Sequence, residues 1–337
     1  MNRDWNKLLE FETRDLVERF VFTRFERKPN AAKVQEITSN FIQGREYFKS
    51  ANDSDFTVKP LLQYYGILAL SKGLILALNP SLSETHLKAS HGLEIKNWKQ
   101  ILKNKEFEKL KIGIGDGSFS ELINATENRN YLRANSSGIN WKSSLTKPKK
   151  GDTICLEQLI QYYPDLNAEF KSWTGKELVY LVISGSQQSE NTSKIILQGK
   201  INESDLDLIF PKNYCKNRVY KNQVLTYESK NWGPNVTQKW NGPFNVGDAC
   251  AIPVLKNDIG LNLISGMFMI SYVFGMMARY YPTAWISLRK GEKGDKIYPF
   301  AYRIMEFIDN KFPKVVVDFL NAPYDFEKKQ KTAVNNV

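Results

Sequence analysis

The stretch that decides the fold is residues 31–78, AAKVQEITSNFIQGREYFKSANDSDFTVKPLLQYYGILALSKGLILAL. In its first half, apolar residues recur at helical spacing and therefore share one face of a helix over 31–51. These residues are Val34, Ile37, Phe41 and Phe48. The second half is apolar on almost every side, which is typical of a helix buried in a large core or in a membrane. A polar turn at 52–55 separates the halves, so the stretch predicts a helical hairpin of the kind found in bundles, with its second helix over 59–79.

Each predicted helix carries a cation where an apolar residue is expected. Arg45 falls on the apolar face of the first helix, and Lys72 interrupts the second. Because buried Arg and Lys are rare unless paired, a polar network or an anion is expected to meet these helices. One interpretation is a structural ion pair with an acidic residue such as Glu36 or Glu46. The other is a pocket for a phosphate or carboxylate, in which Arg donates two parallel N–H hydrogen bonds and Lys supplies a compact positive charge.

The pocket interpretation draws in residues from the C-terminal part of the chain. If the hairpin packs against a helix over 258–281, Arg279 becomes a third cation near several tyrosines. His91 is a candidate general base or phosphate contact because its unperturbed pKa lies near neutrality, although the pattern favours a hydrogen-bonded structural histidine at a turn. The predicted ligand-binding residues are Arg45, Tyr64, Tyr65, Lys72, His91, Arg279 and Tyr280.

Composition limits the class of protein. The chain has 337 residues, 42% of them hydrophobic and 12% aromatic, which is enough for one elaborated domain or two. Its net charge of +11 favours contact with nucleic acid, nucleotides or another polyanion. Runs of charge are more often solvated faces, however, so the charge alone does not identify a partner.

Cysteine and histidine usage argues against a metal centre. Cys155, Cys215 and Cys250 are widely spaced, and the chain has only two histidines, His86 and His91. This spacing suits neither a structural zinc site nor a disulfide framework, so we expect no metal and no cofactor. The acidic pairs Asp53/Asp55 and Asp205/Asp207 lack the ligand set of a metal site. The spacing of Asp53/Asp55 is typical of a helix-capping position, and Asp205 and Asp207 are expected at alternate positions of a strand. Reduced thiols and an N-terminus unlike a signal peptide predict a cytoplasmic protein.

Residues 259–278, IGLNLISGMFMISYVFGMMA, are long enough and apolar enough to span a membrane. The segment contains Asn262 and two serines, and it ends in Arg279 and Pro282, which suit the C-terminus of a soluble helix. We therefore expect two central core helices, 59–79 and 258–281, and no membrane insertion.

The order of elements along the chain indicates an α+β fold, namely a predominantly helical bundle with a β-containing insert. Helices are predicted over 1–27, 31–51 and 59–79 before the insert, and over 258–281, 298–309 and 313–320 after it. Between them, turn-rich segments favour antiparallel strands. The expected strands are 109–112, 178–184, 194–197, 206–210, 223–227 and 250–254, with one helix at 156–162. The predicted domains are 1–80, 81–255 and 256–322, followed by a polar tail at 323–337.

Three further patterns have a functional and a simpler interpretation. Gly113-x-Gly115-x-Gly117-Ser118 before a helix-like run could cradle phosphate, but its spacing favours a tight turn or bulge. The aromatic residues Trp232, Trp240 and Phe244, interleaved with lysines, could stack on bases or form a small core or a partner surface. The basic loop 289–296 is either a contact surface or a solvated connector.

Several strings together resemble the YaaC-like family of bacterial proteins. They are QGREYF at 43–48, KPLLQYYG at 59–66, HGL at 91–93, GSF at 117–119 and MARYYP at 277–282 followed by Trp285. The similarity covers most of the chain in order, except for 185–245. It implies a bacterial source and a cytoplasmic location, and it names no activity.

A looser likeness is to HEPN-type helical bundles, which include RNases and effectors of stress or phage defence. Those RNases need an arginine shortly before a histidine on one helix face, and residues 80–87, PSLSETHL, contain none. The first hypothesis is therefore a binding or regulatory protein for an anionic ligand, nucleic acid or protein partner. The alternative is a nuclease or nucleotide-modifying enzyme that uses His91 with Arg45 or Arg279.

Overall fold

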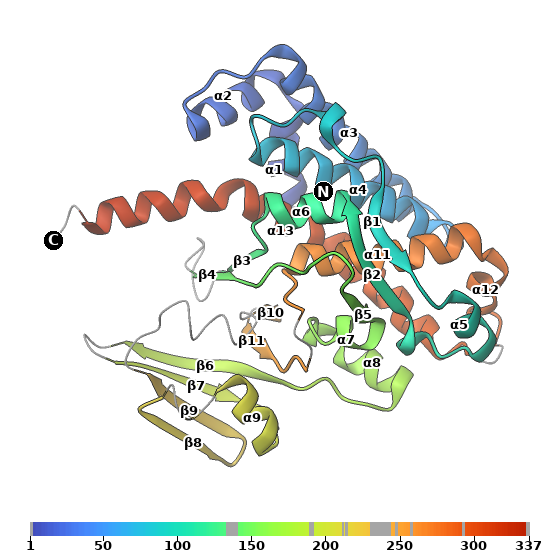
Figure 1. The fold of residues 1–337 in the computed structure, drawn as a ribbon, viewed down its shortest axis with the longest axis vertical. Coiled ribbons are helices and arrows are strands. Elements are labelled where there is room, and N and C mark those ends of the chain that lie inside the picture. The colour runs from blue at the N-terminus through green and yellow to red at the C-terminus, as the bar shows by residue number, and fades with distance from the viewer. Residues whose placement is uncertain are drawn as a thin grey trace. The chain divides into compact units, whose positions relative to one another are not determined.

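A computed structural model describes residues 3–132, 141–188, 192–210, 212, 215–229, 244–246, 249–256, 259–291 and 294–334 (Figure 1). The chain forms two compact units. Unit 1 comprises Met1–Glu127, Pro148–Leu156 and Leu263–Val337, and unit 2 comprises Asn128–Lys147 and Glu157–Asn262. Unit 1 thus continues beyond residue 80, where the sequence predicts the first domain boundary.

Unit 1 is built from helices of both chain ends and a small sheet. Its helical elements are α1 (Arg3–Leu8), η1 (Leu9–Glu12), α2 (Arg14–Phe25), α3 (Ala31–Asp53), α4 (Lys59–Leu78), η2 (Glu84–His86), α5 (Trp98–Asn104), η3 (Phe107–Lys109), α6 (Ser118–Ala125), α11 (Leu263–Tyr280), α12 (Pro282–Ser287) and α13 (Ile297–Val334). Its strands are β1 (His91–Ile95), β2 (Lys111–Gly117) and β5 (Thr153–Cys155), which pair antiparallel in the order β1-β2-β5.

Helix α4 is the centre of unit 1, and it packs against α3, α11, α13 and α6. In Figure 1 the blue helices of the N-terminal end accordingly lie beside the orange and red helices of the C-terminal end. Glycines allow the closest approaches: a Cβ at Gly66 would lie 2.7 Å from the Phe48 ring of α3, and one at Gly275 would lie 2.9 Å from Cβ of Tyr64. Cores are packed to crystal-like density, so these crossings fix the relative positions of the three helices.

Unit 2 contains the larger sheet. Its elements are β3 (Arg129–Leu132), β4 (Trp141–Ser144), α7 (Leu156–Ile160, of which Leu156 belongs to unit 1), η4 (Pro164–Leu166), α8 (Asn167–Thr174), β6 (Tyr180–Gln188), β7 (Ser193–Gln198), α9 (Glu203–Ile209), β8 (Asn217–Lys221), β9 (Val224–Ser229), β10 (Phe244–Val246) and β11 (Ala249–Pro253). Six strands form an antiparallel sheet in the order β10-β11-β6-β7-β9-β8, and β3 pairs with β4. Leu181, Leu197 and Leu225 of the sheet share a buried core with Leu206 and Phe210 at helix α9.

The α+β prediction is confirmed, since helices make up 57% of the described residues and strands 18%. The predicted hairpin is close to the observed one, and the pairing is antiparallel throughout the described sheets. The finer expectation of a predominantly helical bundle is not confirmed, because a three-stranded sheet packs among the helices of unit 1.

Some predicted elements are wrong at the level of helix and strand. Residues 1–27 do not form one helix, because the chain becomes extended at Thr13 (φ −111°, ψ 125°) between η1 and α2. The predicted strand 206–210 lies in helix α9 and at its end, since the side chain of Asn202 accepts from the backbone N–H of Asp205 and begins the helix there. The apolar alternation Leu206-x-Leu208-x-Phe210 had suggested a strand.

The C-terminal helices also differ from the prediction. The sequence predicts two helices, over 298–309 and 313–320, with a polar tail after 322. Pro313, which has no backbone N–H to donate, lies where the second of these would begin. The structure instead has one continuous helix, α13, up to Val334. Phe312 and Val316, both fully buried, anchor the chain on either side of the proline, so packing outweighs the lost hydrogen bond.

Two helices, α4 and α11, are long and apolar enough to cross a membrane. In this fold they contact each other, and the 18-residue apolar windows of α4 and α11 are 67% and 83% buried inside the protein. Such burial is typical of the core helices of a soluble protein.

Candidate functional site

The centre of the candidate site is a hydrogen bond between α4 and β1. The hydroxyl of Tyr64 lies 2.6 Å from Nδ1 of His91. Tyr272 of α11 packs against both rings, with centroid distances of 5.6 Å to each, and its hydroxyl donates to the carbonyl oxygen of Leu93 at 2.9 Å. Three elements that are far apart in sequence therefore meet at one imidazole.

The local backbone explains why His91 lies there. His91 is the first residue of β1 and pairs with Gly117, the last residue of β2. The register shifts by one residue before Leu93, and Gly92 has a φ of +74°, so the strand is irregular beside the histidine. A Cβ at Gly117 would lie 2.4 Å from the backbone nitrogen of Gly92, so only glycine permits this approach.

Burial sets the protonation states of this centre. Burial, and next the positive charges of Arg279 and Lys72, lower the pKa of His91, so its imidazole is neutral at pH 7. Burial raises the pKa of Tyr64 far above its usual range and that of Tyr272 to about 12. The Tyr64 phenol therefore stays protonated and shares a hydrogen bond with Nδ1 of the neutral His91, in which the imidazole tautomer decides which group donates.

Two cations and an exposed tyrosine form the rim of the site. Arg279, at the end of α11, donates to the Tyr65 hydroxyl at 2.9 Å and lies over the ring of Tyr280 at 5.1 Å. Tyr280 is 59% exposed. Lys72 is half-buried on α4, seven residues after Tyr65 and so on the same helix face. Within the described part of the chain, neither Lys72 nor Arg279 pairs with a carboxylate.

Glu94 of β1 is a carboxylate whose charge acts on this centre. Its charge contributes to raising the pKa of Tyr272. Glu94 itself lies 3.5 Å from Nζ of Lys96, so its charge is partly balanced on its own strand. We use the term anion cluster for Tyr64, Tyr65, Lys72, His91, Tyr272, Arg279 and Tyr280.

Arg45, the seventh predicted ligand-binding residue, is held elsewhere. Its guanidinium binds the Glu12 carboxylate of η1 through two hydrogen bonds of 2.7 and 3.0 Å, and it also pairs with Glu46 at 2.9 Å. The inward position on α3 is occupied by Gly44, which is buried against Leu70. For Arg45 the structure thus shows the ion-pair arrangement, with Glu12 as the main partner.

The remaining sequence patterns have structural surroundings. The glycines of Gly113-x-Gly115-x-Gly117 lie within strand β2, directly before α6. Asp205 pairs with Lys256 and Asp207 with Arg218, while Asp55 pairs with Arg289 of the basic loop. Trp232 and Trp240 lie outside the described residues, as does the side chain of Phe244. The described residues contain no group of three or more metal-ligating side chains.

Sequence reasoning did not single out Tyr272. A signal was present, since Tyr272 precedes Arg279 by seven residues and therefore shares its helix face. The Tyr272 hydroxyl could therefore have been assigned to the same site as the arginine.

The side chains of the anion cluster can bind and orient an anion directly. The arginine offers paired N–H donors and the lysine a point charge, both of which suit phosphate or carboxylate oxygens, and the neutral imidazole carries one N–H.

Comparison with known proteins identifies the family. The family model described as YaaC-like protein matches residues 9–320, while neither the curated proteins nor the solved structures gave a significant match. The match includes every member of the anion cluster and confirms the resemblance seen in the sequence strings, whereas the likeness to HEPN-type bundles rests on the sequence alone. The chain belongs to the YaaC-like protein family.

Proposed function

We propose that this chain is a cytoplasmic binding protein that recognises a small anionic ligand, in the first place a phosphate or phosphate ester, at the anion cluster. One observation carries the proposal: Arg279 and Lys72 both act on the half-buried His91, and within the described residues neither has a carboxylate partner. Charges that are not balanced inside the protein favour an anion from outside.

The arrangement of burial supports binding at a defined position. Tyr64 is fully buried and His91 half-buried, whereas Arg279 is exposed, so an anion at the rim remains in contact with water. Exposed charges are screened by solvent and salt, and the affinity is therefore expected to fall as ionic strength rises. The hydrogen bond between Tyr64 and His91 holds the imidazole in one orientation, which reduces the ordering cost of binding.

The experiment is a titration of the ¹⁵N-histidine-labelled protein with inorganic phosphate and, separately, with AMP, followed by NMR. Only two histidines contribute signals, and a His86→Asn variant assigns them. We expect a bound anion to shift the His91 signals and to raise the pKa of His91, because an opposite charge nearby favours the imidazolium form.

The variants Arg279→Gln and Lys72→Gln should each weaken binding by about tenfold. Arg289→Gln is the matched control, since Arg289 is an exposed arginine that already pairs with Asp55. If Arg279→Gln and Arg289→Gln weaken binding equally, or if neither anion shifts the His91 signals, the proposal is wrong. Binding of nucleic acid or of a protein partner through other surfaces would leave those signals unchanged as well.

A second candidate is an enzyme that cleaves or modifies a nucleotide. The observation in its favour is that a neutral imidazole, two phenols and an arginine occupy one cluster, which is a usable set for general base catalysis. Turnover of AMP or of a dinucleotide, followed by ³¹P NMR, should then be abolished by His91→Asn while binding persists. Binding without any product supports the first candidate.

A further inference from the structure

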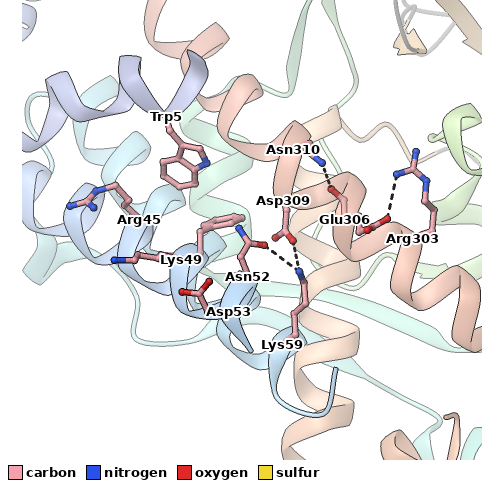
Figure 2. A pocket seen from close by; sticks show the side chains of 11 residues that line it. Trp5, Arg45, Lys49, Asn52, Asp53, Lys59, Arg303, Glu306, Asp309 and Asn310 are labelled. Atoms are coloured by element: carbon pink, nitrogen blue, oxygen red, sulfur yellow. Dashed lines mark hydrogen bonds and ion pairs between the residues drawn. The ribbon is translucent and has the colours of Figure 1, made fainter. Parts of the chain in front are cut away.

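A cavity with a volume of about 690 Å³ lies in unit 1 on the side of the α3–α4 hairpin away from the anion cluster. Residues of α1, α3, α4 and α13 line it (Figure 2). The ring of Tyr47 on α3 packs on the ring of Tyr65 in the anion cluster, with centroids 5.6 Å apart. Arg45 and Lys49 line the cavity, and each is two residues from Tyr47. Two residues correspond to about 160° around a helix, so the cavity lies on the opposite face of α3 from the anion cluster.

The inner part of the cavity is a polar network that is satisfied within the protein. Nζ of Lys59 lies 2.8 Å from the carboxylate of Asp309 and 3.2 Å from Oδ1 of Asn52. Gln63 donates to the other carboxylate oxygen of Asp309 at 2.6 Å. Figure 2 shows the side chains of Asn52, Lys59 and Asp309 converging at this point. Burial raises the pKa of Asp309, so the ion pair is held in a poorly solvated place.

Most of the remaining charges on the cavity wall also have partners. Arg45 binds Glu12 and Glu46, and Arg303 lies 3.8 Å from Glu306. Two charges are left, namely Lys49 and Asp53 on α3, which have no ion-pair partner among the described residues. They are four residues apart, so they lie about 6 Å from each other along the helix axis.

The apolar wall of the cavity is aromatic. Trp5 of α1 and Phe48 of α3 meet edge to face, with ring centroids 5.3 Å apart. In Figure 2 the indole of Trp5 lies on one side of the cavity and the Lys59–Asp309 pair on the other. A side chain inserted between them would therefore contact a ring on one side and polar groups on the other.

We infer that this cavity binds a zwitterion with an apolar or aromatic side chain, that is, a free α-amino acid or a dipeptide. One unpaired ammonium and one unpaired carboxylate match a ligand that carries one charge of each sign, and the rings of Trp5 and Phe48 match its side chain. The volume lies within the range of small-molecule sites. This inference does not rest on the proposed anion site.

The charges of the cavity argue against a phosphorylated ligand. After the ion pairs are formed, Lys49 is the only cation on the wall without a partner among the described residues, and Asp53 lies one helical turn away. A dianion would gain one ion pair and meet one repulsive carboxylate, whereas a zwitterion gains two favourable contacts.

The test is saturation-transfer NMR on the full chain with L-phenylalanine and L-alanyl-L-phenylalanine as probes. N-acetyl-L-phenylalanine and L-phenylalaninamide, which each lack one of the two charges, should bind about tenfold more weakly than L-phenylalanine. Comparison of the two zwitterions shows whether a free amino acid or a dipeptide fits better.

The variants Lys49→Gln and Asp53→Asn should each weaken binding of the zwitterions, and both residues are exposed, so the fold should be preserved. Lys28→Gln, at an exposed lysine outside the cavity, is the control. Arg279→Gln should leave amino-acid binding unchanged, and Lys49→Gln should leave the phosphate response of His91 unchanged, so the two sites are tested separately.

The inference is wrong if neither zwitterion shows saturation transfer, or if the singly charged analogues bind as well as L-phenylalanine. It is also wrong if AMP binds with a dependence on Lys49, because the cavity would then be a second anion site.

Discussion

The two sides of the α3–α4 hairpin differ in whether their positive side chains are paired with carboxylates. On one side, Arg279 and Lys72 act on His91 and have no carboxylate partner among the described residues. On the other side, Arg45 and Lys59 are matched by Glu12 and Asp309. Both sides belong to one basic protein, and only the pairing of the charges distinguishes a surface that attracts anions from one that is nearly neutral.

The comparison shows why net charge is a poor guide to a site. A total of +11 describes the whole chain, but a cation that already binds a carboxylate contributes little to recognising a ligand. The available charges are found only once the fold has placed acidic residues from distant elements, as Glu12 is placed beside Arg45 from another element. A change at the crossing of α3 and α4 should affect both sides, whereas a change on one side should leave the other side as it is.

The largest effect is expected for Gly66→Leu at the crossing of α3 and α4. A Cβ there would lie 2.7 Å from the Phe48 ring and 3.3 Å from the Phe48 backbone nitrogen, so the helices would have to separate. We expect a loss of about 3 kcal/mol in the free energy of unfolding, measured by urea denaturation, together with weaker binding on both sides of the hairpin.

The control for this change is Gly115→Ala, where the nearest atom to a new Cβ is the Gly92 carbonyl oxygen at 3.9 Å. This variant should keep the wild-type urea midpoint. An unchanged midpoint in Gly66→Leu would show that the two helices do not approach as closely as described.

The next effect is expected for Arg45→Gln, which removes one partner of an ion pair. Glu12, with a side chain only 13% exposed, would lose its bidentate partner. We expect a loss of about 1 to 2 kcal/mol in stability, less than for a fully buried pair because the Arg45 side chain is 29% exposed.

A double-mutant cycle with Glu12→Gln should recover part of this loss, since the carboxylate is then no longer left unpaired. Phosphate binding at His91 should not change in Arg45→Gln. A reduced phosphate affinity in a folded Arg45→Gln protein would contradict the separation of the two sides.

The third prediction concerns pH. His91 should titrate below its usual pKa of about 6.5, and Arg279→Gln should raise that pKa more than Lys72→Gln, since Arg279 has the larger electrostatic influence. NMR titration of the two histidines measures both shifts. If Arg279→Gln leaves the His91 pKa unchanged, the arginine does not act on the imidazole.

The sign of the effect on stability follows from proton linkage. Because the pKa of His91 is lower in the folded state, the unfolded state binds more protons as the pH falls below about 6.5. The contribution of His91 to stability is therefore fully present above that pH and is lost as the pH falls through the lowered pKa. His91→Asn should flatten this part of the pH–stability profile.

The sequence predicted the hairpin well, because apolar periodicity and the polar turn are local signals that burial then reinforces. Val34, Ile37, Phe41 and Phe48 are buried as expected, and the helices end within two residues of the predicted positions. Short strands such as β1 and β5 were missed, since three to five residues that include glycine or charged side chains carry little β signal.

The site was predicted only in part, and for a physical reason. Helical periodicity could place Tyr64, Tyr65 and Lys72 on α4, and it could place Arg279 at the end of a second helix. It could not show that Glu12 would reach Arg45, because that contact depends on the bend at Thr13, where the predicted single helix ends. Nor could it pair Lys59 with Asp309, which lie 250 residues apart.

The smallest effect is expected for Tyr280→Leu at the rim of the anion cluster. The Tyr280 ring is 59% exposed and its contact is with the guanidinium of Arg279 at 5.1 Å, so its removal should leave stability within about 0.5 kcal/mol of wild type. Phosphate affinity should fall by about twofold, because the ring packs on the guanidinium of Arg279 and helps to orient it. Tyr280→Phe, which keeps the ring, should retain the wild-type affinity in the same NMR titration. If Tyr280→Phe loses as much affinity as Tyr280→Leu, the hydroxyl contacts the anion directly, and Tyr280 belongs to the binding surface itself.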